Sequence, residues 1–299
     1  MADAISIRGL TKTYAAHTAV GGLDLDVRSG ECFALLGPNG AGKTTTVEIL
    51  EGFRSRDAGE VRVLGVDPQG AGLAWRNRVG IVLQTTGGLD LLTPREALTS
   101  TAKAYSSPRR VDDVLGSVGL DDKADARIVG LSGGQRRRLD VALGIIGRPE
   151  LLFLDEPTTG FDPQARRDFW DLIRSLATEG TTILLTTHYL DEAETLADRV
   201  GVIAAGRLLA LDTPGALGGR SLEEATVSWE EHGIRRQVTT STPTAQVARL
   251  AARMPGGEVP ALTVTRPSLE DTYLSLIAPH VGSEALHPAA AHDSTEVPA

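Results

Sequence analysis

A glycine-rich loop that directly follows a continuous apolar run constrains the fold of this chain more than any other feature. The run, Cys32–Leu36, does not alternate apolar with polar residues, which is typical of a strand buried on both faces in a parallel sheet. The loop has a glycine, four further residues and then Gly-Lys-Thr, a spacing that predicts a turn from this strand into a helix. It reads Gly37-Pro38-Asn39-Gly40-Ala41-Gly42-Lys43-Thr44, followed by Thr45.

The same loop predicts a phosphate-binding site. Without Cβ atoms in the way, backbone N–H groups can converge on phosphate oxygens at the positive end of the helix dipole. Lys43 is then expected to reach the β- and γ-phosphates of ATP, and the Thr44 hydroxyl to bind Mg²⁺. A plain glycine-rich turn is the alternative, and the strand before the loop and the helix after it favour the phosphate site.

Two adjacent carboxylates end a second apolar run, Leu151–Leu154. The carboxyl ends of parallel strands are where ligands bind in open α/β sheets. We therefore expect Asp155 to hold Mg²⁺, directly or through water, and Glu156 to serve as the general base for the attacking water. A solvated turn is the alternative for two acids at a strand end, and the phosphate loop argues against it.

A third motif stands upstream of these acids and reads Leu131-Ser132-Gly133-Gly134-Gln135. Its serine and glycines predict the capped start of a helix at Gln135, with exposed amides and the dipole forming an anion site. This string is identified as the signature of ABC-type ATPases. The resemblance implies that it faces the ATP held by a second ABC subunit, in a head-to-tail dimer around two nucleotides.

The resemblance also implies roles for four further residues. Tyr14 resembles the aromatic residue that stacks on adenine, and Gln84 the glutamine that meets Mg²⁺ or water and senses the transporter subunit. His188 resembles the histidine that contacts the γ-phosphate and helps to position Glu156, and Asp162 the aspartate that lies across the dimer interface. Taken without this context, Tyr14 would be assigned to packing and His188 to a structural role.

The expected fold class is α/β, a P-loop NTPase ABC cassette with a RecA-like parallel sheet core, an antiparallel β subdomain and a helical subdomain. Alternation in Ile5–Leu10 and Leu23–Arg28 predicts the antiparallel strands. The helical subdomain is expected at about 90–145, where Thr93-Pro94-Arg95-Glu96 predicts a helix start. The cassette is expected to span residues 1–218.

A small C-terminal α+β unit is expected over residues 219–278, with strands at Ala225–Trp229 and Val259–Val264, a helix at Pro243–Met254 and an amphipathic end at Ser268–Ile277. Residues 279–299 lack periodicity and are expected to form a disordered tail. That tail holds three histidines, for which a solvated tail is favoured over a metal site.

Composition limits the partners. No apolar run approaches the roughly 20 residues of a bilayer-spanning helix, so the chain is expected at the cytoplasmic face of the membrane, bound to separate integral membrane transporter subunits. The net charge of −9 argues against nucleic acid as a partner. Cys32, the one cysteine, is expected to be a buried hydrophobe. The basic run Arg136–Arg138 is expected to be a charged helix surface, with a role beside the signature loop as the alternative.

A finer resemblance, to bacterial ATPases of daunorubicin-resistance-type exporters, is carried by Leu131–Pro163, Gly206–Pro214 and Pro267–Tyr273. It implies export of a drug, lipid or polysaccharide-like substrate, with the substrate itself and the choice between homodimer and heterodimer left open. A soluble ABC ATPase acting on ribosomes or DNA is the alternative, and this chain has neither a second cassette nor a heptad run. A guanine-reading Asn-Lys-x-Asp motif is absent, and the intact catalytic motifs argue against a regulator that does not hydrolyse ATP.

Overall fold

Every residue of strand β3 (Cys32–Leu36) is buried, because this strand lies inside a sheet that is covered on both faces. The computed structural model describes residues 3–15, 17–82, 88–222, 224–231 and 233–280. Its largest sheet has the strand order β5-β6-β7-β3-β8-β9, and all neighbours are parallel except the pair β8 and β9. The other strands of this sheet are β5 (Val79–Val82), β6 (Leu151–Asp155), β7 (Thr182–Thr187), β8 (Arg199–Ala204) and β9 (Arg207–Asp212).

Side chains of β3 point alternately to two hydrophobic cores. Phe33 and Leu35 pack with the antiparallel sheet and with helix α1 (Lys43–Leu50), whereas Ala34 and Leu36 pack with the helices on the opposite face. This two-sided burial explains why the strand is apolar at every position. The antiparallel sheet has the order β2-β1-β4, formed by β1 (Asp3–Tyr14), β2 (His17–Arg28) and β4 (Ala58–Val63). The predicted parallel and antiparallel strands are therefore confirmed.

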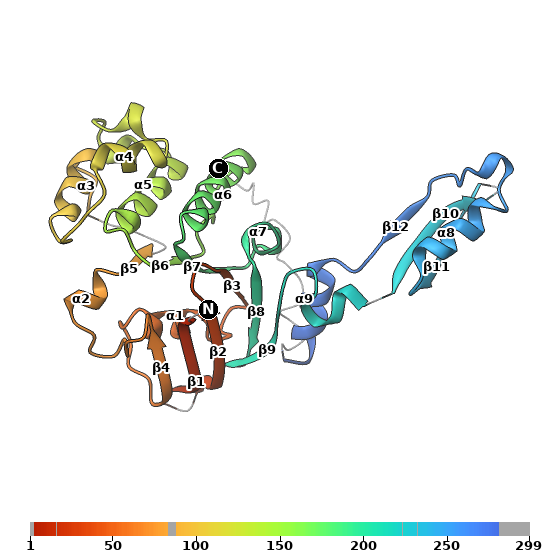
Figure 1. The fold of residues 1–299 in the computed structure, drawn as a ribbon, viewed down its shortest axis with the longest axis horizontal. Coiled ribbons are helices and arrows are strands. Elements are labelled where there is room, and N and C mark those ends of the chain that lie inside the picture. The colour runs from red at the N-terminus through yellow and green to blue at the C-terminus, as the bar shows by residue number, and fades with distance from the viewer. Residues whose placement is uncertain (1–2, 16, 83–87, 223, 232, 281–299) are drawn as a thin grey trace, which may run out of the picture.

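A group of helices lies beyond the edge strand β5, joined to the sheet through helix α5 (Figure 1). Helix α3 begins as expected, because the Thr93 hydroxyl accepts a hydrogen bond from the Glu96 amide while the Glu96 side chain accepts one from the Thr93 amide. The helices and 3₁₀ turns from the central region are α2 (Leu73–Arg76), α3 (Pro94–Ala102), α4 (Val111–Ser117), η1 (Asp121–Lys123), η2 (Ile128–Gly130), α5 (Gly133–Ile145), α6 (Pro163–Thr178) and α7 (Leu190–Leu196).

The C-terminal region contains a small sheet with its own core. Strands β11, β10 and β12 form an antiparallel sheet, and helix α8 packs on it around Val227, Leu250 and Val259. Figure 1 shows this unit projecting away from the larger sheet. Strand β12 is shorter than expected, and β11 was not predicted. The bounds are β10 (Ala225–Glu231), β11 (Ile234–Thr240), α8 (Pro243–Ala251), η4 (Pro255–Gly257) and β12 (Thr263–Thr265).

Among the described residues, helix α9 (Leu269–Ile277) contributes to the main hydrophobic core and not to the core of the small sheet. Its buried residues Leu269 and Ile277 join the main hydrophobic core, where α9 contacts α7 and the turn η3 (Leu217–Leu222). This packing differs from the expected place of the segment at the end of the small unit, while the division of the chain into domains stays a prediction. A last turn, η5, covers Ala278–His280 and so includes the first two residues of the predicted tail 279–299, and the tail from residue 281 on lies outside the described residues.

No helix within the described ranges is both long enough and apolar enough to span a bilayer.

Candidate active site

The glycine-rich loop runs from the end of β3 into α1, as predicted, and its backbone allows no side chain at two of its glycines. A Cβ on Gly37 would lie 2.3 Å from the carbonyl oxygen of Ile203, and one on Gly42 would lie 2.3 Å from that of Ala19. Gly42 also has a φ of 99°, in the left-handed region that favours glycine. Packing against neighbouring backbone therefore requires glycine here, in addition to the phosphate geometry for which the motif is known.

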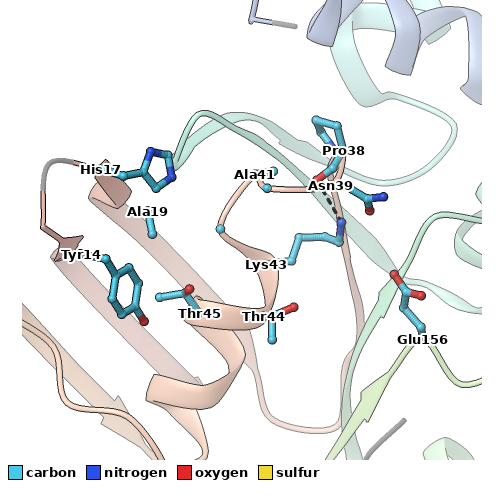
Figure 2. A pocket seen from close by; sticks show the side chains of 12 residues that line it. Tyr14, His17, Ala19, Pro38, Asn39, Ala41, Lys43, Thr44, Thr45 and Glu156 are labelled. Atoms are coloured by element: carbon cyan, nitrogen blue, oxygen red, sulfur yellow. Dashed lines mark hydrogen bonds between the residues drawn. The ribbon is translucent and has the colours of Figure 1, made fainter. Parts of the chain in front are cut away.

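The Lys43 ammonium group folds back over the loop. Its Nζ donates hydrogen bonds to the carbonyl oxygens of Gly37 at 2.6 Å and Pro38 at 3.2 Å, and Figure 2 shows the second of these. Burial lowers the pKa of Lys43, while the charges of Glu156 and Asp155 oppose that shift. The positive charge is thus held at the inner surface of the loop, where an anionic ligand with phosphate oxygens would meet it.

A cavity of about 280 Å³ lies over this loop and is open to solvent. Tyr14 lines it on one side and Glu156 on the other, across from Lys43 (Figure 2). The structure therefore brings together residues from β1, the loop and the end of β6, as the sequence predicted. The residues that line the cavity are Tyr14, His17, Ala19, Pro38, Asn39, Gly40, Ala41, Gly42, Lys43, Thr44, Thr45 and Glu156.

The two acids at the end of β6 are held in place by the neighbouring strand. The Thr186 hydroxyl donates a hydrogen bond to Asp155 Oδ1 at 2.5 Å, and the Glu156 amide donates to the Thr186 carbonyl oxygen at 3.1 Å. Glu156 has a φ of 44°, which costs free energy for a residue with a side chain and is a feature that concentrates at functional sites. The carboxylate of Glu156 is thereby turned into the cavity instead of continuing the alternation of the strand.

His188 follows β7 and contacts the predicted base. Its Nδ1 lies 3.4 Å from Glu156 Oε2, and its ring stacks at 4.1 Å between centroids with that of Tyr189. Gln84, predicted to meet Mg²⁺ or water, lies outside the described residues. Its assignment stays a prediction.

The signature motif begins a helix two residues earlier than expected. Helix α5 starts at Gly133, and Ser132 caps it: the Gln135 amide donates to Ser132 Oγ at 3.3 Å, and the Gln135 side chain accepts from the Ser132 amide at 3.0 Å. Gly134 faces Ala165 of α6, since an added Cβ would lie 3.6 Å from it. Among the described residues that line the cavity of Lys43, none comes from this motif.

Asp162 caps helix α6. Its Oδ1 accepts hydrogen bonds from the amides of Gln164 at 2.9 Å and Ala165 at 2.8 Å, and the helix begins at Pro163. Its role at a dimer interface stays a prediction.

Tyr14 is 36% exposed, and its ring lies near the cations of Lys12 and Arg54, whose distances from the ring centroid are 5.5 and 5.2 Å.

The structure shows one contact that the sequence reasoning missed. Arg137, in the middle of the basic run, is only 7% exposed, and its Nε and NH2 donate to the carbonyl oxygens of Pro157 at 2.9 Å and Asp155 at 2.8 Å. Its two neighbours form surface ion pairs instead, Arg136 with Asp90 and Arg138 with Asp168. The expectation of a charged helix surface is therefore wrong for Arg137. Its spacing of four residues from Val141, on the buried stripe of α5, was the signal that could have indicated this.

Thr44, which lines the cavity, and Asp155, next to Glu156, form a donor set that suits Mg²⁺. Asp155 offers a carboxylate and Thr44 a hydroxyl, the hard oxygen ligands that this ion prefers. Within the described part of the chain, no three or more His, Cys, Asp or Glu side chains are grouped to hold a metal. That arrangement fits an ion held by one carboxylate together with substrate phosphates better than an ion in a site built wholly from the protein.

Comparison with known protein families gives one match, the ABC transporter family over residues 20–159. The chain is 45% identical over 219 residues to the daunorubicin/doxorubicin resistance ATP-binding protein DrrA of Streptomyces peucetius, an alignment that covers 72% of this chain and 66% of that protein. It is 39% identical over 295 residues to the Nod factor export ATP-binding protein I of Rhizobium sp. (strain N33), covering 91% of this chain and 96% of that protein.

Solved structures of similar fold agree with these relatives. A structure of cbiO1 from Clostridium perfringens, described as part of the ABC transporter complex cbiONQ, has a TM-score of 0.66 and 25% identity and covers 72% of this chain and 90% of its own. A bacterial ABC transporter cassette solved as a dimer has a TM-score of 0.63 and 23% identity, covering 70% and 98%. This second likeness concerns the fold alone.

Proposed function

Because this chain belongs to the ATP-binding subunits of ABC transporters, a family that hydrolyses ATP, we propose that it binds Mg-ATP at the Lys43 loop and hydrolyses it with Glu156 as general base. The observation that carries the proposal is that Lys43 and Glu156 line the same cavity, with Asp155 next to Glu156 in the sequence. The cation sits where triphosphate charge would accumulate, and the carboxylate sits across from it.

Each residue has a distinct task in this reaction. Amides of the loop and the Lys43 ammonium group bind the phosphates, and release of the lysine from the Gly37 carbonyl would accompany their arrival. Glu156 accepts a proton from the attacking water, and His188 orients Glu156 through its 3.4 Å contact. Thr44 and Asp155 would hold Mg²⁺, which supplies charge neutralisation to the phosphate oxygens when bound.

We further propose that the site is completed by a second copy of this chain. Ser132 and the amides after it form a capped helix start away from the cavity of their own subunit. A helix N-terminus favours anionic groups, so this one is suited to cover a nucleotide held by another subunit. Head-to-tail closure of two such subunits would then enclose two ATP molecules.

Export is the direction that the relatives favour, since one is named for daunorubicin and doxorubicin resistance and another for Nod factor export. We propose that this chain powers export of a drug, lipid or polysaccharide-like substrate through separate membrane subunits, from the cytoplasmic face of the membrane. A soluble ABC ATPase acting on ribosomes or DNA is not favoured by these relatives. Co-purification of this chain with a polytopic membrane protein supports the transporter assignment, and co-purification with ribosomes or DNA contradicts it.

The proposal is tested by two substitutions in the purified chain. Lys43→Ala should weaken equilibrium binding of Mg-ATP at least about 10-fold, because it removes the buried cation from the phosphate loop. Ser132→Arg should leave binding by the single subunit intact while it abolishes ATP-driven dimerisation. Unaltered ATP affinity in the first variant contradicts the phosphate-loop assignment. Normal dimerisation of the second contradicts the cross-subunit site.

A further inference from the structure

Arg137 joins the signature helix to the strand end that carries the predicted base. Two of its hydrogen bonds go to the carbonyl oxygens on either side of Glu156, those of Asp155 and Pro157. A fork of two donors from one planar guanidinium group fixes the direction as well as the position of this backbone. Since Glu156 has a strained φ of 44°, contacts that hold its flanking peptide groups also determine where its carboxylate lies.

The same helix begins at the cap formed by Ser132. Arg137 stands five residues after this cap, which is roughly 7 Å along a helix that rises about 1.5 Å per residue. Between them α5 is a continuous α-helix, and it packs into the main core through Leu139, Val141 and Ala142. A displacement of the Ser132 end therefore moves the Arg137 guanidinium with it, because the segment has no irregular turn that could absorb the movement.

A second buried ionisable group, Glu192, lies near the residues that follow the strand end. Glu192 of α7 is fully buried, and Trp170 Nε1 donates to its Oε1 at 3.4 Å. Burial raises the pKa of Glu192, and the hydroxyl groups of Thr187 and Thr158 oppose that shift, although the Thr158 hydroxyl makes no full hydrogen bond. Thr158 therefore lies near Glu192 of α7, whereas the fork of Arg137 bonds the carbonyl oxygens of Asp155 and Pro157 to the signature helix.

We propose that Arg137 is a positioning residue that links the two nucleotide sites. When the Ser132 loop of a subunit contacts the nucleotide held by its partner, Arg137 transmits that contact to Glu156 of its own subunit, which acts on the subunit's own nucleotide. This inference rests on the proposed function, because it requires two sites in a head-to-tail dimer. In each subunit, a nucleotide that contacts the cap at Ser132 displaces helix α5. The guanidinium group of Arg137 moves with the helix and repositions the backbone of Asp155 and Pro157, which flank the base. Hydrolysis at one site thereby depends on occupation of the other.

The test is a double-mutant cycle on ATP hydrolysis by the full chain, with Arg137→Gln, Ser132→Ala and the two combined. Arg138→Gln is the matched control, since it removes an exposed ion pair with Asp168 from the next position of the same helix. We expect Arg137→Gln to lower kcat by about 10- to 100-fold, the range for misplacing a catalytic group, with ATP affinity changed less than about 2-fold. Arg138→Gln should stay within about 2-fold in both quantities.

The coupling itself is read from the combined variant. If Arg137 transmits the contact, Ser132→Ala lowers kcat at least about 3-fold less in the Arg137→Gln background than in the unmodified chain. Independent, multiplicative losses overturn the coupling, and an unchanged kcat in Arg137→Gln overturns the positioning role. Arg137→Lys keeps the charge with a single donor group and should recover part of kcat. No recovery, with a lowered melting temperature, would show that the role is only structural.

The unmodified chain and Glu156→Gln are measured in parallel. Absence of ATP hydrolysis in the unmodified chain would contradict the proposed function. Hydrolysis that is lost in Glu156→Gln but unaffected by Arg137→Gln would contradict this inference alone.

Discussion

Glu51 offers a prediction that depends mainly on burial. Glu51 is the residue directly after helix α1 and is only 7% exposed. It lines a cavity of about 290 Å³ together with Phe53, Trp75 and Tyr105. No described residue donates a hydrogen bond to it. Burial raises its pKa to about 8, with smaller contributions from the charges of Asp155 and Glu48.

The sign of the pH effect follows from the two protonation states. In the unfolded chain Glu51 loses its proton near the ordinary value of 4.5, whereas in the folded chain it keeps the proton until about pH 8. Between these values the unfolded state is increasingly favoured as pH rises, and above pH 8 the penalty is constant. At about 1.4 kcal/mol for each pKa unit, the full penalty is about 5 kcal/mol.

Glu51→Gln removes this penalty without changing the size of the side chain. We expect its melting temperature to match that of the unmodified chain near pH 5 and to exceed it by about 10 °C at pH 8.5, taking about 2 °C for each kcal/mol in a chain of this size. The assay is thermal unfolding followed by circular dichroism across that pH range. Glu150→Gln is the control, because Glu150 is exposed, pairs with Arg78 at 2.6 Å and is not among the charges that act on Glu51. An increase that is equal at both pH values, or absent at both, refutes the reasoning.

Two further predictions concern the backbone around the site. Gly42→Ala should weaken Mg-ATP binding at least about 10-fold more than Gly40→Ala does. The reason is that a Cβ at Gly42 meets the Ala19 carbonyl oxygen, while one at Gly40 meets no atom within 4 Å. Equal affinities of the two variants in an equilibrium binding assay would contradict this. Asp162→Ala should lower the free energy of unfolding by about 1 kcal/mol through loss of the α6 cap, and Asp162→Asn should retain most of the stability. Denaturant titrations that show no difference between Asp162→Ala and the unmodified chain would contradict a stabilising role of this cap.

The parts of the fold that were predicted correctly are those that local sequence determines. Strand β3 is apolar at every position because both faces are buried, and the caps at Thr93 and Ser132 are satisfied by residues three positions later. Such features are encoded within a few residues, so they can be recognised without the rest of the chain. The start of α5 was placed two residues late because the glycines were assigned to the loop when they form the first turn.

The features that were missed depend on distant contacts. Strand β11 was not predicted because most of its side chains are exposed and carry no alternation. The stripe of α9 indicated one buried face, but not that this face packs on the cassette core. Arg137 is chemically like its two neighbours, and only the position of Asp155 and Pro157, 18 and 20 residues later, separates its role from theirs.

The central claim is that Glu156 takes the proton from the water that attacks a triphosphate bound by Lys43. The most direct measurement is ATP turnover by Glu156→Gln, compared with the unmodified chain at equal nucleotide occupancy. The account predicts Mg-ATP affinity within about 2-fold and turnover at least about 100-fold slower, the range for losing a positioned general base. Equal turnover at equal occupancy would contradict it.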